Sequence, residues 1–512
     1  MGALVMEYGS DGKVKKSSGK WGRRSKRFVN GVVNGSDFPR DWLAQPKGHR
    51  SRLGLALSWW VSACFVSVFA IGVPALHAQD TLAPQADPRD LGLALARNAP
   101  IVLANQETVL CPEREGAAPV VGRLQFTSGN RSIVLLPSGR LVSVETSATT
   151  PTDRPFEPAN PDTLAEQLVA DTFHDFTIKQ TRHYTFIYNS SEEFATGTSR
   201  ILESMYPKLI AYCEKQGLQV QEPAVPLVVI MFQSEAEFQA YRPMPEGVVA
   251  YYNGINNQVV MYEKSRLVDV APAIAIKLAI STVAHEGVHQ ILHNIGVQPR
   301  LSRWAPWISE GFPEFCSPTD VARGIRWKGV GLVNDLRLHN LVERSKVPGH
   351  DFGSGELIRA TVTADSLDSD GYAAAWALTY FLAKHRPREF KEFLTELSSD
   401  SAPLSGESGE EQLARFTRYF GEDLESLEQE MIRRVSALPY VDPVENQPHY
   451  VVLVRIGPRI ASVVTPSPAA IAQWQQELMS QLAPAEQASA RVLIDIYPNR
   501  TLAQQAQRAA LN

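Results

Sequence analysis

The sequence contains the stretch His285-Glu286-Gly287-Val288-His289, followed further along the chain by Trp307-Ile308-Ser309-Glu310-Gly311. Residues four apart lie on one face of a helix, so His285 and His289 would present two imidazoles that suit adjacent corners of a zinc tetrahedron. Glu286 lies beside them, where its carboxylate could act on a metal-bound water. Glu310 is the candidate third ligand, which would leave the fourth position open, as in a catalytic zinc site.

The residues around these histidines predict a buried helix over residues 273–295, because apolar side chains recur there at helical spacing. Pro272 can open this helix and Gly296 can end it. A second helix is predicted from about Pro306 and would carry Glu310 and, one turn later, Glu314.

The histidines of this segment also allow other interpretations. His285 and His289 could be core histidines satisfied by neighbours, but a glutamate beside the first on an apolar helix needs a reason. His293 lies on the same face, yet about 12 Å of helix rise from His285 is too far for one ion, so we expect a helix-end or surface residue. A metzincin site needs glycine and histidine where this chain has Leu292 and Ile295.

The two motifs together resemble the gluzincin metallopeptidases, and residues 307–312 are particularly similar to the third-ligand helix of the aminopeptidases in that group. Residues 175–438 resemble a peptidase-MA-like domain found in secreted bacterial proteins. The resemblance implies a Zn²⁺ cofactor, with Glu286 as general base. The zinc ligands that it implies are His285, His289 and Glu310.

Further site residues follow from the same resemblance. Glu314 stands where the family often has an acidic residue that orients a ligand histidine, although it could equally be a solvated carboxylate on the helix surface. Pro313 departs from the family pattern, and deeper than the first turn it would kink the helix or move its start. Tyr372, on a helix predicted over residues 371–382, is a candidate oxyanion donor or else a packing residue, and His339 and His350 could serve instead.

The fold expected from these patterns is α+β, with a mixed sheet lobe followed by a helical lobe. Strands are predicted at 184–188 and 227–232, a helix at 195–216, and a hairpin whose strands 248–252 and 258–262 flank the turn at 253–257. In gluzincins an edge strand ahead of the metal helix binds an extended peptide, a role that residues 248–261 could fill. The hairpin could equally have no substrate role.

The chain divides into a basic tail (1–52), a signal peptide or membrane anchor (53–78), a small β domain with a linker (79–165), the gluzincin-like zinc peptidase domain (166–440) and a C-terminal α/β module (441–512). Residues 53–73 carry no charge, and cleavage would fall near Ala78. Retained, this run could span a bilayer. Either way the chain is expected to be exported, to the periplasm, cell envelope or medium, with membrane attachment through residues 53–73 if the segment stays.

The modules at the two ends show no catalytic constellation. A β-meander is predicted at 120–144 with a proline-rich linker at 149–161. A βαβ-type module is predicted at the C-terminus, from strands at 450–455 and 491–497 and a helix at 469–482, with a final helix after Pro498.

The net charge and the cysteine content bear on which classes of function are possible. A net charge of −5 gives no case for nucleic-acid binding. Removal of the signal would leave Cys111, Cys213 and Cys316, of which Cys316 is expected to be a packing residue. The sequence therefore predicts a zinc metallopeptidase acting on a peptide or protein. Two alternatives stay open, a non-proteolytic zinc amide or ester hydrolase and a zinc-holding binding or scaffold protein without turnover.

Overall fold

The computed structural model describes residues 5–8, 14–17, 93–95, 99–105, 107–114, 116–245, 247–264, 272–320, 326–346, 352–399, 406–440, 442, 445, 447–466 and 468–511. The predicted signal peptide or anchor at 53–78 and the candidate His350 lie outside these ranges. Within the basic tail, β1 (Val5–Tyr8) pairs antiparallel with β2 (Val14–Ser17). No helix of the described part is both long and apolar enough to cross a membrane.

An antiparallel sheet forms the first module after the tail, and it confirms the predicted meander. The strand order is β7-β6-β5-β4-β8, and β3 pairs with the other half of β5. The predicted linker is wrong in part, because Thr150–Pro151 forms β8 and pairs with β4. The elements are β3 (Ile101–Leu103), β4 (Thr108–Pro112), β5 (Pro119–Ser128), β6 (Arg131–Leu135), β7 (Leu141–Glu145), the 3₁₀ turn η2 (Thr146–Ala148) and β8.

A mixed five-stranded sheet follows, with the order β12-β13-β11-β10-β9. The three central strands β10, β11 and β13 are parallel, and the edge strands β9 and β12 are antiparallel to their neighbours. The predicted hairpin is therefore confirmed, and its first strand is an edge of the sheet. The strands are β9 (Thr177–Gln180), β10 (Tyr184–Tyr188), β11 (Leu227–Ser234), β12 (Ala250–Asn253) and β13 (Gln258–Lys264).

The central strands bury both faces of this sheet, and alternate side chains contribute to two different cores. Phe186, Val229 and Met231 pack toward α2 (Glu192–Lys215) and α5 (Pro272–Asn294). Ile187, Val228 and Ile230 pack on the other side, toward α1 (Pro161–Asp171) and α3 (Glu235–Tyr241). The side chains on one face of the sheet thus pack directly against α5, the helix that carries the two histidines, and hold it in place.

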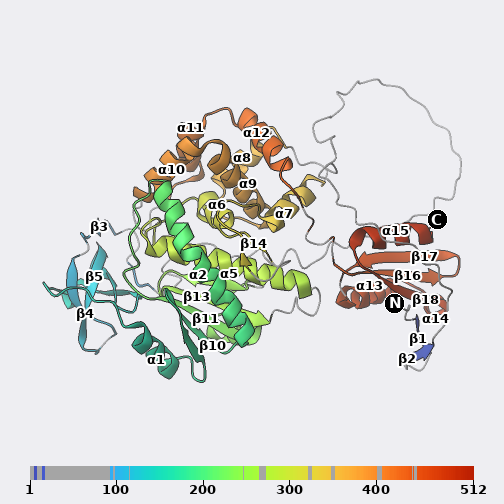
Figure 1. The fold of residues 1–512 in the computed structure, drawn as a ribbon, viewed down its shortest axis with the longest axis horizontal. Helices are drawn as coiled ribbons and strands as arrows, with labels where there is room; N and C mark the ends of the chain where they lie inside the picture. Colours follow the sequence, from blue (N-terminus) through green and yellow to red (C-terminus); the bar gives the residue numbers. More distant parts are fainter. Residues whose placement is uncertain are drawn as a thin grey trace.

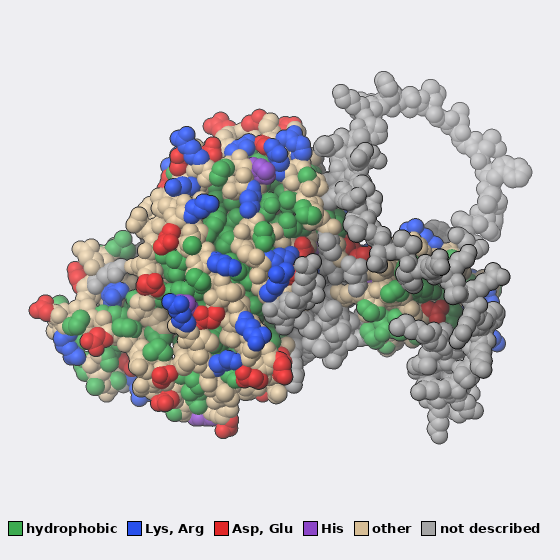
Figure 2. All heavy atoms as spheres, viewed as in Figure 1, with side chains coloured by type: hydrophobic (Ala, Val, Ile, Leu, Met, Phe, Trp, Pro, Cys, Tyr) green, Lys and Arg blue, Asp and Glu red, His purple; other side chains and the backbone are tan. Residues whose placement is uncertain are grey.

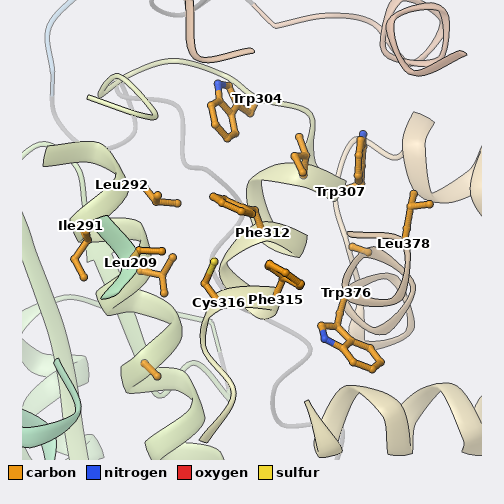
Figure 3. Close-up of a cluster of buried hydrophobic side chains, with 14 of the residues drawn as sticks. Leu209, Ile291, Leu292, Trp304, Trp307, Phe312, Phe315, Cys316, Trp376 and Leu378 are labelled. Atoms are coloured by element: carbon orange, nitrogen blue, oxygen red, sulfur yellow. The ribbon is translucent and has the colours of Figure 1, made fainter. Parts of the chain in front are cut away.

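The helical region completes the larger core, as Figure 1 shows above the sheet. In Figure 3, α6 lies between α5 and α9, with Phe312, Phe315 and Cys316 directed into the space between them. Cys316 is fully buried and unpaired, as predicted for a packing residue, and Cys111 and Cys213 are also buried free thiols. The elements are α6 (Pro306–Cys316), β14 (Thr319–Asp320), β15 (Arg326–Trp327), α7 (Asp335–Ser345), α8 (Glu356–Thr363), α9 (Ser369–His385), α10 (Pro387–Ser399), α11 (Gly409–Phe420) and α12 (Leu424–Ser436).

The C-terminal module differs from the prediction. Its central strand β16 pairs antiparallel with both β17 and β18, so the βαβ arrangement, which needs parallel strands, is wrong. The predicted strands and helices are present, but β17 was missed. The elements are β16 (His449–Ile456), β17 (Arg459–Thr465), α13 (Pro468–Ser480), α14 (Pro484–Ser489), β18 (Arg491–Tyr497) and α15 (Arg500–Leu511).

The molecular face drawn in Figure 2 carries basic and acidic side chains interspersed over the central body. The described residues on this face form no extended surface of one sign of charge.

Candidate metal site

The α5 helix places both histidines and the glutamate between them in the interior. It spans Pro272–Asn294, as predicted, and Gly296 follows with a φ of 83°, a left-handed conformation that glycine adopts without strain. The residues His285, Glu286 and His289 are 2%, 5% and 8% exposed. Polar groups buried this deeply need partners, and the second helix supplies them.

The α6 helix brings Glu310 to the histidines. It begins at Pro306, as predicted, and continues through Pro313, so the departure from the family pattern does not shift its start. Trp307 and Phe312 anchor the helix in the core. A β-carbon on Gly311 would lie 2.6 Å from the Ala375 carbonyl oxygen of α9, so only glycine allows this close approach of the two helices.

Three ligand atoms converge at one point between these helices. His285 Nε2 lies 3.1 Å from His289 Nε2 and 3.1 Å from Glu310 Oε2, and His289 Nε2 lies 3.4 Å from the same oxygen. Zinc–ligand bonds of about 2.0–2.1 Å place neighbouring corners of a tetrahedron about 3.3–3.4 Å apart. The three atoms are therefore spaced like three corners of such a site, and this buried group could hold a metal ion.

Glu314 lies behind His285, one helical turn beyond Glu310. Its Oε1 is 3.1 Å from His285 Nδ1, an ion-pair distance, although the ring N–H is not aligned well enough for a hydrogen bond. The same carboxylate accepts hydrogen bonds from Arg337 Nη2 and Asn334 Nδ2, both at 2.7 Å. Glu314 is buried, so it is no solvated surface carboxylate, and it stands where it could orient the imidazole.

The histidines and carboxylates shift one another's ionisation. Burial alone would lower the pKa of His285, but the carboxylates of Glu310 and Glu314 outweigh this effect and raise it. Burial would raise the pKa of Glu310, yet His289 and His285 hold it below its ordinary value. The field between these groups thus favours a positive charge on the His285 imidazole and a negative charge on Glu310.

The charges of the buried group leave room for a divalent cation. Glu286, Glu310 and Glu314 carry three negative charges when ionised, and the guanidinium of Arg337 balances one of them. Metal binding requires both imidazoles to be neutral, and two negative charges then remain, which one divalent ion would neutralise. The histidine nitrogens suit zinc better than calcium or magnesium, which prefer oxygen ligands.

One carboxylate oxygen of Glu286 faces the edge of the sheet. Its Oε2 accepts a hydrogen bond of 2.8 Å from the backbone N–H of Tyr252 in β12. Burial raises the pKa of Glu286, while His285 and His289 oppose that shift. The raised pKa brings this carboxylate closer to the range in which a general base works.

Of the remaining candidate residues that the structure describes, one lies beside the ligand cluster and two take no part in it. Tyr372 is buried with its ring centroid 6.3 Å from that of His285, and Arg337 lies 4.9 Å over its ring. His293 takes no part in the ligand cluster, because its Nδ1 lies 2.8 Å from the Gln298 carbonyl oxygen at the end of α5. His339 stands against Tyr440, with its Nδ1 2.8 Å from the Tyr440 hydroxyl.

Sequence reasoning missed three groups that contact the site. Arg337 and Asn334 lie at the start of α7, in a segment where no helix was predicted, and the Tyr252 contact uses a backbone N–H, which no side-chain pattern reveals. Asn334 carries a weak signal, since its side chain caps α7 by accepting from the Arg337 backbone N–H.

A family model described as a protein of unknown function (DUF1570) matches residues 279–405. The matched range contains His285, His289 and Glu310 together with Glu314 and Arg337, so the whole buried group lies inside it. The description assigns no activity. No curated protein matches the chain.

Proposed function

We propose that this chain is an exported zinc metallopeptidase of the gluzincin type, with His285, His289 and Glu310 as the zinc ligands. The observation that carries the proposal is the spacing of the two Nε2 atoms and Glu310 Oε2, at 3.1, 3.1 and 3.4 Å. It fits three corners of a zinc tetrahedron, and a three-residue set leaves one corner for water or substrate. When bound, zinc would polarise the scissile carbonyl and make water a better nucleophile near neutral pH.

Glu286 has the position and environment of a general base. It lies beside His285 on α5 without belonging to the ligand cluster, and the Tyr252 N–H holds one of its oxygens. In the proposed reaction Glu286 takes a proton from the attacking water and passes it to the leaving amine.

The β12 strand offers a binding edge for an extended peptide beside this base. Among the strands of the described part of the chain, β12 pairs with β13 alone, along one of its two sides. The N–H of Tyr252 points away from β13 toward Glu286, and the alternation of an antiparallel ladder places the backbone groups of Ala250 on the same open side. A substrate strand added along this edge would place its backbone close to Glu286, which is why we favour a peptide or protein as substrate.

Tyr372 is proposed as the oxyanion donor. Burial raises its pKa well above the ordinary value, with a smaller contribution from Glu310, so the hydroxyl keeps its proton at neutral pH. The cation–π contact with Arg337 orients the ring. Export rests on the uncharged run at residues 53–73 and its basic flank.

A peptide-library digest tests the proposal, with the zinc content of each sample measured alongside. The wild type should cleave peptides, and Glu286→Gln should lose turnover while it keeps zinc. Loss of zinc in Glu286→Gln would contradict the role of base. Cleavage of small amides or esters without peptides would favour the non-proteolytic hydrolase, and zinc without any turnover would favour the scaffold.

A further inference from the structure

A cavity lies between the N-terminal sheet and the end of α5. Its volume is about 320 Å³, at the lower end of the range for small-molecule sites. Arg123 from β5 lines one part, and Arg300, from the segment after α5, lines another. None of the described residues that line this cavity is an aspartate or a glutamate, so the two guanidinium groups share the space without a described acidic side chain in its wall.

Neither guanidinium is neutralised by a carboxylate elsewhere among the described residues. Arg300 donates to the Gly139 carbonyl oxygen at 2.6 Å and to Asn294 Oδ1 at 2.8 Å, both neutral acceptors. The guanidinium carbon of Arg123 lies 4.6 Å from the centroid of the Phe156 ring, a cation–π contact that does not neutralise the charge. Burial lowers the pKa of Arg300, which is the cost of holding a charge there without a counterion.

Beside the polar residues Gln125, Gln221, His293 and Asn294, the cavity wall has an apolar part. It includes Phe126, Leu135, Leu141, Val225 and Leu301. Bare inorganic anions gain nothing from such a wall, whereas an organic anion could bury an apolar body against it while its charged end meets the arginines.

We propose that this cavity binds a small organic carboxylate with an apolar body, held by Arg123 and Arg300. The site is distinct from the candidate metal site, because none of its lining residues is a proposed metal ligand. It nevertheless lies close by, since His293 lines the cavity one turn beyond His289 and stacks on Tyr252 at 5.4 Å between ring centroids.

Calorimetric titration with phenylacetate tests this proposal on the purified full-length chain. Phenylacetate should bind saturably, and the neutral analogue phenylacetamide and inorganic phosphate should bind at least tenfold more weakly, because each lacks one of the two recognised features. Arg123→Gln and Arg300→Met should each weaken phenylacetate binding by roughly tenfold or more.

The matched control is Arg114→Gln, an exposed arginine of the same module that does not line the cavity, and it should leave the affinity unchanged. Circular dichroism would show whether Arg300→Met still folds after losing the hydrogen bonds of Arg300. If it does not fold, Arg123→Gln alone tests the proposal. Absence of saturable binding to the wild type, equal binding of phenylacetamide, or unchanged affinity in Arg123→Gln would overturn the proposal.

Discussion

Arg337 Nη2 donates to Glu314 Oε1 across 2.7 Å, and both side chains are buried, at 3% and 4% exposure. This pair links α7 to α6 directly behind His285. A buried carboxylate without its cation is costly, so the pair bears on both the stability of the fold and the orientation of the imidazole.

Replacing Arg337 alone should strongly destabilise the protein. Arg337→Met leaves Glu314 buried without its guanidinium, and we expect the free energy of unfolding to fall by about 3–5 kcal/mol, measured by urea denaturation. The double variant with Glu314→Leu removes the orphaned charge and should recover part of that loss. Equal stability of the single and double variants would contradict the view that the charge of Glu314 is the cause.

Replacing Glu314 by an isosteric amide should weaken the metal site and also lower stability, because Arg337 then lacks its carboxylate partner. Glu314→Gln keeps the shape but removes the charge facing His285 Nδ1, and zinc affinity should fall roughly 10- to 100-fold. Competition against a chelating dye measures this change. An affinity equal to that of the wild type would show that Glu314 does not orient the imidazole.

The contact between α6 and α9 depends on Gly311. An added β-carbon would lie 2.5 Å from Thr379 Oγ1 and 2.6 Å from the Ala375 oxygen, so Gly311→Ala should force the helices apart and cost roughly 1–3 kcal/mol. Zinc affinity should fall as well, because Glu310 is the adjacent residue. At Gly254 the nearest atom to an added β-carbon is 3.8 Å away, and Gly254→Ala serves as the tolerated control. Thermal denaturation of both variants measures the difference, and equal stability of Gly311→Ala and Gly254→Ala would contradict the prediction.

A pH-dependent contribution to stability is expected at Glu203 on α2. Burial alone would raise its pKa, but hydrogen bonds from Thr181 Oγ1 at 2.6 Å and the His183 backbone N–H at 2.8 Å outweigh burial and lower it below the ordinary 4.5. A lowered folded-state pKa means that the contact stabilises the fold above about pH 4.5 and is lost as pH falls through the folded-state pKa.

The Glu203→Gln variant should therefore be less stable than the wild type at pH 7, with a difference that shrinks below pH 4.5. Glu214→Gln, an exposed change on the same helix, should show no such dependence. Urea denaturation over this pH range gives the answer, and a constant difference for Glu203→Gln would refute the assignment.

The parts of the site that lie close together in sequence were predictable, and the parts joined by tertiary contacts were not. Helical spacing and the proline and glycine signals placed α5 and the start of α6 correctly, because these are local effects. Arg337 reaches Glu314 only after α6 and α7 have both packed against α9, and nothing local marks it. The direction of strand pairing is equally non-local. The β17 strand, in contrast, could have been predicted, because Gly457-Pro458 is a turn sequence that indicates a hairpin between β16 and β17.

The metal content of the purified chain tests the central claim most directly. Elemental analysis should find about one zinc per chain in the wild type, because a three-residue ligand set of this spacing holds one ion. His289→Ala should lose the metal, and His174→Ala, which changes an exposed histidine outside the cluster, should keep it. A wild type that binds no zinc even when zinc is supplied, or a His289→Ala variant that retains it, would contradict the account.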